Sequence, residues 1–101
     1  MRPRTFRKQP WEELTKATDF SEEVPAGVTV SSATISAKKK SDGSPATSDV
    51  LASGTGGTDG QRATWKVKAG VSGQDYQITV QATMSNGDKF EEDVTMEVRE
   101  Q

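Results

Sequence analysis

The stretch QDYQITVQATMSNGDKFEEDVTMEVR, residues 74–99, decides the fold of this chain. Apolar and polar side chains alternate along it with a period of two, which is typical of β-strands that bury one face and expose the other. Glu92 interrupts the apolar face, which indicates either a sheet edge or an interface at that position. The apolar side chains that we expect on the buried face are Tyr76, Ile78, Val80, Ala82 and Met84 in residues 74–84, and Phe90, Val94, Met96 and Val98 in residues 88–99.

The turn between these two strands follows from the requirement that both apolar faces be buried together. A two-residue loop at Asn86 and Gly87 puts the two apolar faces out of phase. A three-residue loop, Ser85–Gly87, with Gly87 in the left-handed conformation, pairs Met84 with Asp88 and brings the faces into phase. We therefore predict the three-residue loop. The resulting partners are Ala82 with Phe90, Ile78 with Val94 and Tyr76 with Met96.

Further segments extend the β pattern toward the N-terminus. Residues 61–69 alternate strictly, and Trp65 lies on their apolar side, so we place Trp65 in the core. Residues 27–37 change phase near residues 31–32, which predicts a bulged or bent strand. The weaker candidates are residues 11–20, which we interpret as an irregular first strand, and residues 47–53, which we interpret as a short strand around Val50 and Leu51.

Composition and turn spacing favour the all-β class. Val and Ile number 11 and Thr 12, against 2 Leu, and β-branched side chains suit half-buried pleated surfaces. Two segments, residues 38–48 and 53–60, are rich in Gly, Ser and Asp, and we expect exposed, mobile loops there. Strands separated by such turns predict a small antiparallel sandwich of about six or seven strands.

The chain has no cysteine and no histidine. This excludes Ser-His-Asp and Cys-His nucleophiles, zinc sites with Cys or His ligands, and a disulfide framework. Any catalysis would depend on Asp, Glu, Lys or Tyr, on a scaffold of 101 residues that is small for a deep pocket. We therefore expect no enzyme activity, no cofactor and no metal. No apolar run reaches the length of a membrane span, about 18 residues, so we expect no membrane insertion.

Charge is distributed unevenly along the chain. Residues 1–10 hold four cations and no acid, so their side chains carry +4, and the rest carries −2 minus +4, or −6. We divide the chain into a basic N-terminal arm, residues 1–10, and a sandwich domain, residues 11–101. The arm suits an acidic surface or a nucleic acid, and the plainer alternative is a solvated chain end. The candidate contact residues are Arg2, Arg4, Arg7 and Lys8 in the arm, and Lys38, Lys39 and Lys40 in the first loop.

The remaining motifs point to little chemistry. The Gly-rich stretch at 53–60 lacks the Lys-Ser/Thr and the helix of a phosphate-binding loop, so we interpret it as a flexible loop. Strand alternation divides the acids of residues 88–93 between two faces, so they do not converge on a cation. No aromatic residue is interleaved with the lysines at 38–40, which disfavours binding to single-stranded nucleic acid. Trp11 remains a candidate interface anchor.

Residues 69–82, AGVSGQDYQITVQA, resemble the corner and following strand of immunoglobulin-like and fibronectin-type domains. That resemblance implies that Tyr76 is the corner tyrosine, with its hydroxyl bonded to nearby backbone. The order of segments from Lys8 onward is similar to the fibre-tail adaptors of tailed phages, which are small immunoglobulin-like structural proteins. Residues 1–7, and Phe20 where a Trp is expected, depart from that pattern. The segments that carry the similarity are KQPWEELTKATDFS (8–21), AGVTVSSATISA (26–37), LASGTGG (51–57) and ATWKVKAGVSGQDYQITVQATMSNGDKFEEDVTMEV (63–98).

The resemblance implies a non-enzymatic virion structural protein of a phage or prophage, in the tail or neck. Such an adaptor acts by protein–protein docking against other tail, fibre or neck subunits, in multiple copies, after synthesis in the host bacterial cytoplasm. It takes no small-molecule substrate. The alternative is a carbohydrate-binding or adhesive module of a bacterial surface protein, which needs exposed aromatic side chains for sugar stacking. A third hypothesis is an enzyme inhibitor or regulator that presents one loop.

Overall fold

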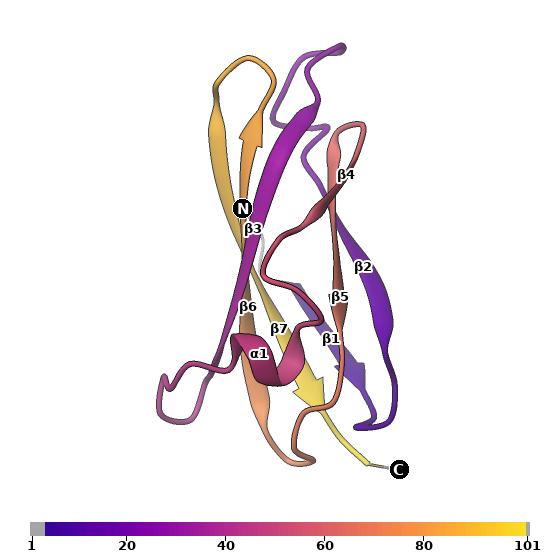
Figure 1. Cartoon of the computed structure of the whole chain (residues 1–101), viewed down its shortest axis with the longest axis vertical. Coiled ribbons are helices and arrows are strands. Elements are labelled where there is room, and N and C mark those ends of the chain that lie inside the picture. The colour runs from indigo at the N-terminus through magenta and orange to yellow at the C-terminus, as the bar shows by residue number, and fades with distance from the viewer. Residues whose placement is uncertain (1–3, 101) are drawn as a thin grey trace.

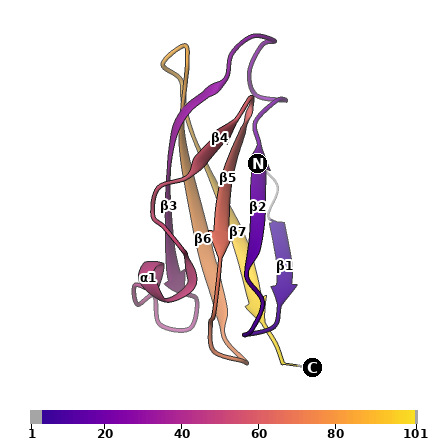
Figure 2. The ribbon, with the colours of Figure 1, turned by 45° about the vertical axis from the view of Figure 1, so that its right-hand side comes forward.

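The computed structural model describes residues 4–100, which form two β-sheets packed face to face (Figures 1 and 2). One sheet has the strand order β1-β7-β6-β3, and the other has the order β2-β5-β4. The predicted all-β sandwich is therefore confirmed. The elements are β1 (Arg4–Lys8), β2 (Leu14–Asp19), β3 (Val30–Lys39), α1 (Thr47–Val50), β4 (Gly57–Asp59), β5 (Arg62–Val67), β6 (Asp75–Met84) and β7 (Lys89–Val98).

The strand order is immunoglobulin-like. Strands β3, β6 and β7 lie in one sheet and β2, β5 and β4 in the other, as the corresponding strands do in immunoglobulin domains. The first strand, β1, joins the edge of β7 and runs parallel to it, whereas the other paired strands are antiparallel. The β6–β7 hairpin lies at one end of the sandwich, and the β1–β2 turn, the β5–β6 connection and α1 lie at the other (Figure 1).

The β6–β7 hairpin has the predicted register. Ala82 lies opposite Phe90, and the two more distant predicted pairs are also present. The amide of Met84 donates to the carbonyl oxygen of Asp88 at 2.7 Å, and Gly87 has φ +93°. The three-residue loop is confirmed. The loop has this length because a two-residue loop would not bury the apolar residues of both strands on one face.

The core lies between the two sheets and contains Trp65 and Tyr76, while Phe90, the third aromatic residue assigned to it from the sequence, is half-buried against it. Trp65 is 5% exposed and its indole Nε1 donates to the hydroxyl of Thr18 at 3.1 Å. Tyr76 is 1% exposed, and its hydroxyl accepts a hydrogen bond from the amide of Val71 at 3.1 Å. Tyr76 is therefore a corner tyrosine that fixes the β5–β6 connection onto β6. The expected irregularity of β3 is also present, as a register shift between Val30 and Ser32.

Two segments differ from their predicted conformations. Residues 47–53 are not a strand: α1 makes one helical turn, and Leu51 then forms an isolated bridge with Val67. Val50 and Leu51 are both buried, and two consecutive inward side chains do not fit the alternation of a strand. Residues 53–60 are not wholly loop, because they include the edge strand β4. A Cβ at Gly56 would lie 2.9 Å from that of Ala33, so glycine permits this close approach to β3.

Candidate docking surface

Half of the predicted basic arm, residues 4–8, is a strand of the sandwich. Strand β1 pairs with β7 along its whole length, in parallel. Strand alternation directs Arg4, Phe6 and Lys8 toward the inside of the sandwich, and Thr5 and Arg7 away from it. The solvated chain end is therefore a wrong interpretation for residues 4–8. The pattern escaped detection because two of the three inward positions are cationic and so do not look like core.

The first of these inward cations meets the acid that interrupts the apolar face of β7. Glu92 is 4% exposed, and its Oε1 lies 3.2 Å from Nε of Arg4. The second carboxylate oxygen, Oε2, is buried without a hydrogen-bond partner among the described residues. A buried carboxylate is costly unless it is paired, so Arg4 compensates Glu92 and anchors the start of β1.

The second inward cation, Lys8, fastens the turn that follows β1. Its side chain is almost fully buried, and its Nζ donates hydrogen bonds to three backbone carbonyl oxygens. These belong to Gln9 (2.7 Å), Pro10 (3.4 Å) and Ala69. Desolvation lowers the pKa of Lys8, and the negative charges of Glu12 and Glu13 offset part of this decrease. We name this arrangement the Lys8 clamp, because it ties the β1–β2 turn to the β5–β6 connection.

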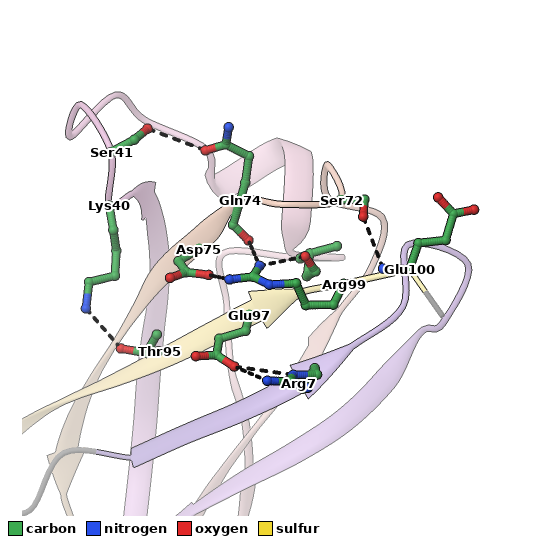
Figure 3. Close-up of polar contacts among 11 residues, drawn as sticks. Arg7, Lys40, Ser41, Ser72, Gln74, Asp75, Thr95, Glu97, Arg99 and Glu100 are labelled. Carbon is green, nitrogen blue, oxygen red and sulfur yellow. Dashed lines mark hydrogen bonds and ion pairs between the residues drawn. The ribbon is translucent and has the colours of Figure 1, made fainter.

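The outward cations lie on the solvent face of the four-stranded sheet (Figure 3). Arg7 contacts Oε1 of Glu97 at 3.3 Å, and Nζ of Lys40 donates to the hydroxyl of Thr95 at 3.3 Å. Arg7 and Lys40 therefore reach neighbouring outward positions of β7 from opposite sides. Exposed ion pairs contribute about 0–1 kcal/mol each, so these contacts do little to hold the fold. Their side chains stay accessible to a partner.

The seven candidate contact residues therefore do not form one patch. Arg4 and Lys8 have internal partners, and Arg2 lies outside the described residues. Lys38 is exposed on β3, and Lys39 is half-buried at the end of that strand. Arg7 and Lys40 contact neighbouring outward residues of β7, Glu97 and Thr95, on the solvent face of that sheet.

The most exposed large apolar side chain among the described residues is Trp11, in the β1–β2 turn. It is 93% exposed, whereas a Trp usually buries most of its ring. Trp11 borders a shallow hollow of about 480 Å³ that Leu14 and Ala69 also line. The next most exposed is Val71, at 59%, in the β5–β6 connection at the same end of the sandwich. We name this end, with Trp11, Leu14 and Val71, the Trp11 surface.

The turn that carries Trp11 is held on both sides. The amide of Gln9 donates to Oε1 of Glu12 at 2.7 Å, and the amide of Glu12 donates to the carbonyl oxygen of Gln9 at 3.1 Å. The Lys8 clamp fixes the same turn from inside. Trp11 is therefore presented from an ordered backbone, which reduces the entropy lost when a partner binds it. The sequence places Trp11 at the start of a predicted strand and does not reveal this bracing, which depends on Lys8 reaching Ala69.

Within residues 4–100 there is no cluster of three or more acidic residues that would hold a metal ion. No helix in the same range is long and apolar enough to cross a bilayer.

The fold and the corner tyrosine define an immunoglobulin-like sandwich module. Residues 8–97 match the family described as "Podophage GP4 fiber-tail adaptor protein gp77". The match covers most of the chain, and the chain belongs to this family. It is thus a phage tail structural protein. No curated protein matches it.

Proposed function

We propose that this protein acts as a non-enzymatic adaptor that joins tail proteins of the virion by docking through the Trp11 surface. The observation that carries the proposal is the exposure of Trp11, at 93%, on a turn braced by the Lys8 clamp. Tryptophan is prominent among the few interface residues that dominate binding energy. The family supports tail or fibre subunits as partners, and supports synthesis in the host cytoplasm followed by incorporation into the virion.

Multiple copies in one particle fit this mechanism. A small interface centred on one Trp and two aliphatic side chains is weak by itself, and repetition raises its effective strength. Docking would also stabilise the fold, whose core is modest, because a partner that binds only the folded chain favours the folded state by mass action. The side chains of Arg7 and Lys40 are a secondary contact that would tune orientation more than affinity.

Incorporation of Trp11→Ala into particles tests the proposal. Loss of a binding hot spot costs about 2 kcal/mol or more, so we expect about 30-fold weaker docking and a matching deficit in purified tails. Quantitative mass spectrometry of the particles measures this. Ser36→Ala, an exposed change on β3, is the control and should be incorporated normally. Normal incorporation of Trp11→Ala with an unchanged unfolding transition would contradict the proposal.

The carbohydrate-binding alternative depends on the same residue. An exposed Trp ring also suits stacking on a sugar, so the isolated protein should be tested on a glycan array. Glycan binding that Trp11→Ala abolishes, together with normal incorporation of that variant, would favour the adhesive function over the adaptor function.

A further inference from the structure

Strand β1 occupies a groove whose chemistry is specific for its sequence. Glu92 receives the guanidinium of Arg4, and the ring of Phe6 lies 6.0 Å from that of Trp65, centroid to centroid. The third inward residue, Lys8, donates to the carbonyl oxygen of Ala69, and its other two acceptors belong to its own turn. The edge of β7 therefore selects an extended segment whose alternate residues are a cation, an aromatic and a second cation. We name this edge of β7, with Glu92, Trp65 and Ala69, the β7 groove.

The segment that fills this groove is structurally separable from the rest of the sandwich. It is a five-residue parallel edge strand that pairs with β7 alone among the described strands, so no other of these strands must be displaced for it to leave. Figure 2 shows β1 at the side of the molecule, beside β2. The family match begins at Lys8, so the groove lies in matched residues while Arg4 and Phe6 precede the match.

The connection between β1 and β2 has the features of a hinge for exchange. It spans residues 9–13, and Pro10 restricts Gln9 to extended backbone. Short constrained hinges favour exchange of an edge element between copies, because opening the hinge relieves the constraint while all strand contacts form again in the partner. Two of the three acceptors of Lys8 lie in this hinge, so departure of β1 also releases the closed turn.

We propose that the β7 groove accepts the β1 strand of a second copy as well as its own, so that chains link by strand exchange. The occupant is the segment Arg4–Lys8 of another molecule, in the parallel register observed here. This inference does not depend on the proposed adaptor function, because it concerns self-association and needs no tail partner, although the hinge includes Trp11.

Cysteine cross-linking tests the exchange directly. Thr5 on β1 and Thr95 on β7 are register partners that both point outward, and the chain has no cysteine of its own. Neighbouring strands lie about 4.8 Å apart, which is within the Cα separation that a disulfide spans. The two single variants Thr5→Cys and Thr95→Cys, one carrying a mass tag, are unfolded together, refolded as a mixture and oxidised.

We expect a disulfide-linked heterodimer in that mixture, several-fold above the control pair Thr5→Cys with Thr83→Cys. Thr83 lies on β6 and is not a partner of β1. The double variant Thr5→Cys/Thr95→Cys should close a disulfide within one chain, which verifies the register. Heterodimer no higher than in the control, or no disulfide in the double variant, would overturn the proposal.

Phe6→Ala separates exchange from nonspecific association. In the chain that carries Thr5→Cys, it weakens the incoming strand and should lower the heterodimer yield. In the chain that carries Thr95→Cys, it weakens the competing internal strand and should raise the yield. A change of the same sign in both chains would contradict strand exchange.

Discussion

At the scale of single residues, Arg4 and Lys8 have partners inside the protein, although the sequence around them suggests a solvent-exposed arm. Arg4, whose side chain is half-exposed, pairs with the buried Glu92, and the buried Lys8 is compensated by backbone carbonyl oxygens. Such compensation requires partners far away in the chain, Glu92 and Ala69, so residues 1–10 alone do not reveal it. The charge count describes the arm correctly as basic, but it does not indicate which way each side chain points.

Substitution of Lys8 should lower the free energy of unfolding, although the sequence suggests that this residue is exposed. Lys8→Ala leaves three carbonyl oxygens without their donor, at about 1–3 kcal/mol of unfolding free energy. Lys38→Ala, at an exposed position of β3, is the control and should change it by about 0.5 kcal/mol or less. Urea unfolding of both variants measures the difference. Equal stability would contradict the Lys8 clamp.

The acid in the β3–α1 loop should titrate below its usual range. The backbone amide of Ser44, at 2.9 Å, and then its hydroxyl, at 2.7 Å, donate to Asp42 and lower the pKa of Asp42. Ser44→Ala removes the second donor and should raise that pKa, as measured by NMR titration of the carboxyl carbon.

The sign of the corresponding stability effect follows from linkage. Because the folded pKa of Asp42 is depressed, the stabilisation that Asp42 gives is complete above its unfolded pKa and is lost as the pH falls through the folded pKa. The part of it that depends on the hydroxyl should be absent in Ser44→Ala. An unchanged Asp42 pKa in that variant would show that the hydroxyl does not act on the carboxylate.

At the scale of elements, predictability follows the strength of the alternating pattern. The β6–β7 hairpin was predictable down to its pairs, because each strand has one apolar face and only one loop length aligns them. α1 was not, because two adjacent buried residues, Val50 and Leu51, resemble a short strand. β4 was hidden by glycines that serve close packing against β3 and β5, which composition alone cannot distinguish from a flexible loop.

Two glycines with positive φ should differ in their tolerance of alanine. Gly87 has φ +93° with open space where a Cβ would project, so Gly87→Ala should cost only backbone strain, about 1–2 kcal/mol. Gly70 has φ +94°, and a Cβ there would lie 2.8 Å from Cγ2 of Val98, so Gly70→Ala combines strain with a clash. Thermal unfolding should rank Gly70→Ala as less stable than Gly87→Ala. The reverse order would contradict the packing of the β5–β6 connection against β7.

At the scale of the whole molecule, the sandwich brings the two connections that form the Trp11 surface to one end. The β1–β2 turn and the β5–β6 connection are more than 50 residues apart in sequence, yet the bond between Lys8 and Ala69 joins them. The sequence could identify Trp11 only as a candidate anchor, because its exposure depends on this closure. Membership of the fibre-tail adaptor family supports our proposal that a tail protein binds this exposed, braced tryptophan.

Hydroxyl-radical footprinting of the two tryptophans, in the free protein and in assembled tails, tests docking through the Trp11 surface most directly. In the free protein Trp11, 93% exposed, should be oxidised rapidly, while Trp65, 5% exposed, serves as a protected internal reference. In the tail, Trp11 should become as protected as Trp65. Equal oxidation of Trp11 in the free and the assembled protein would contradict the account.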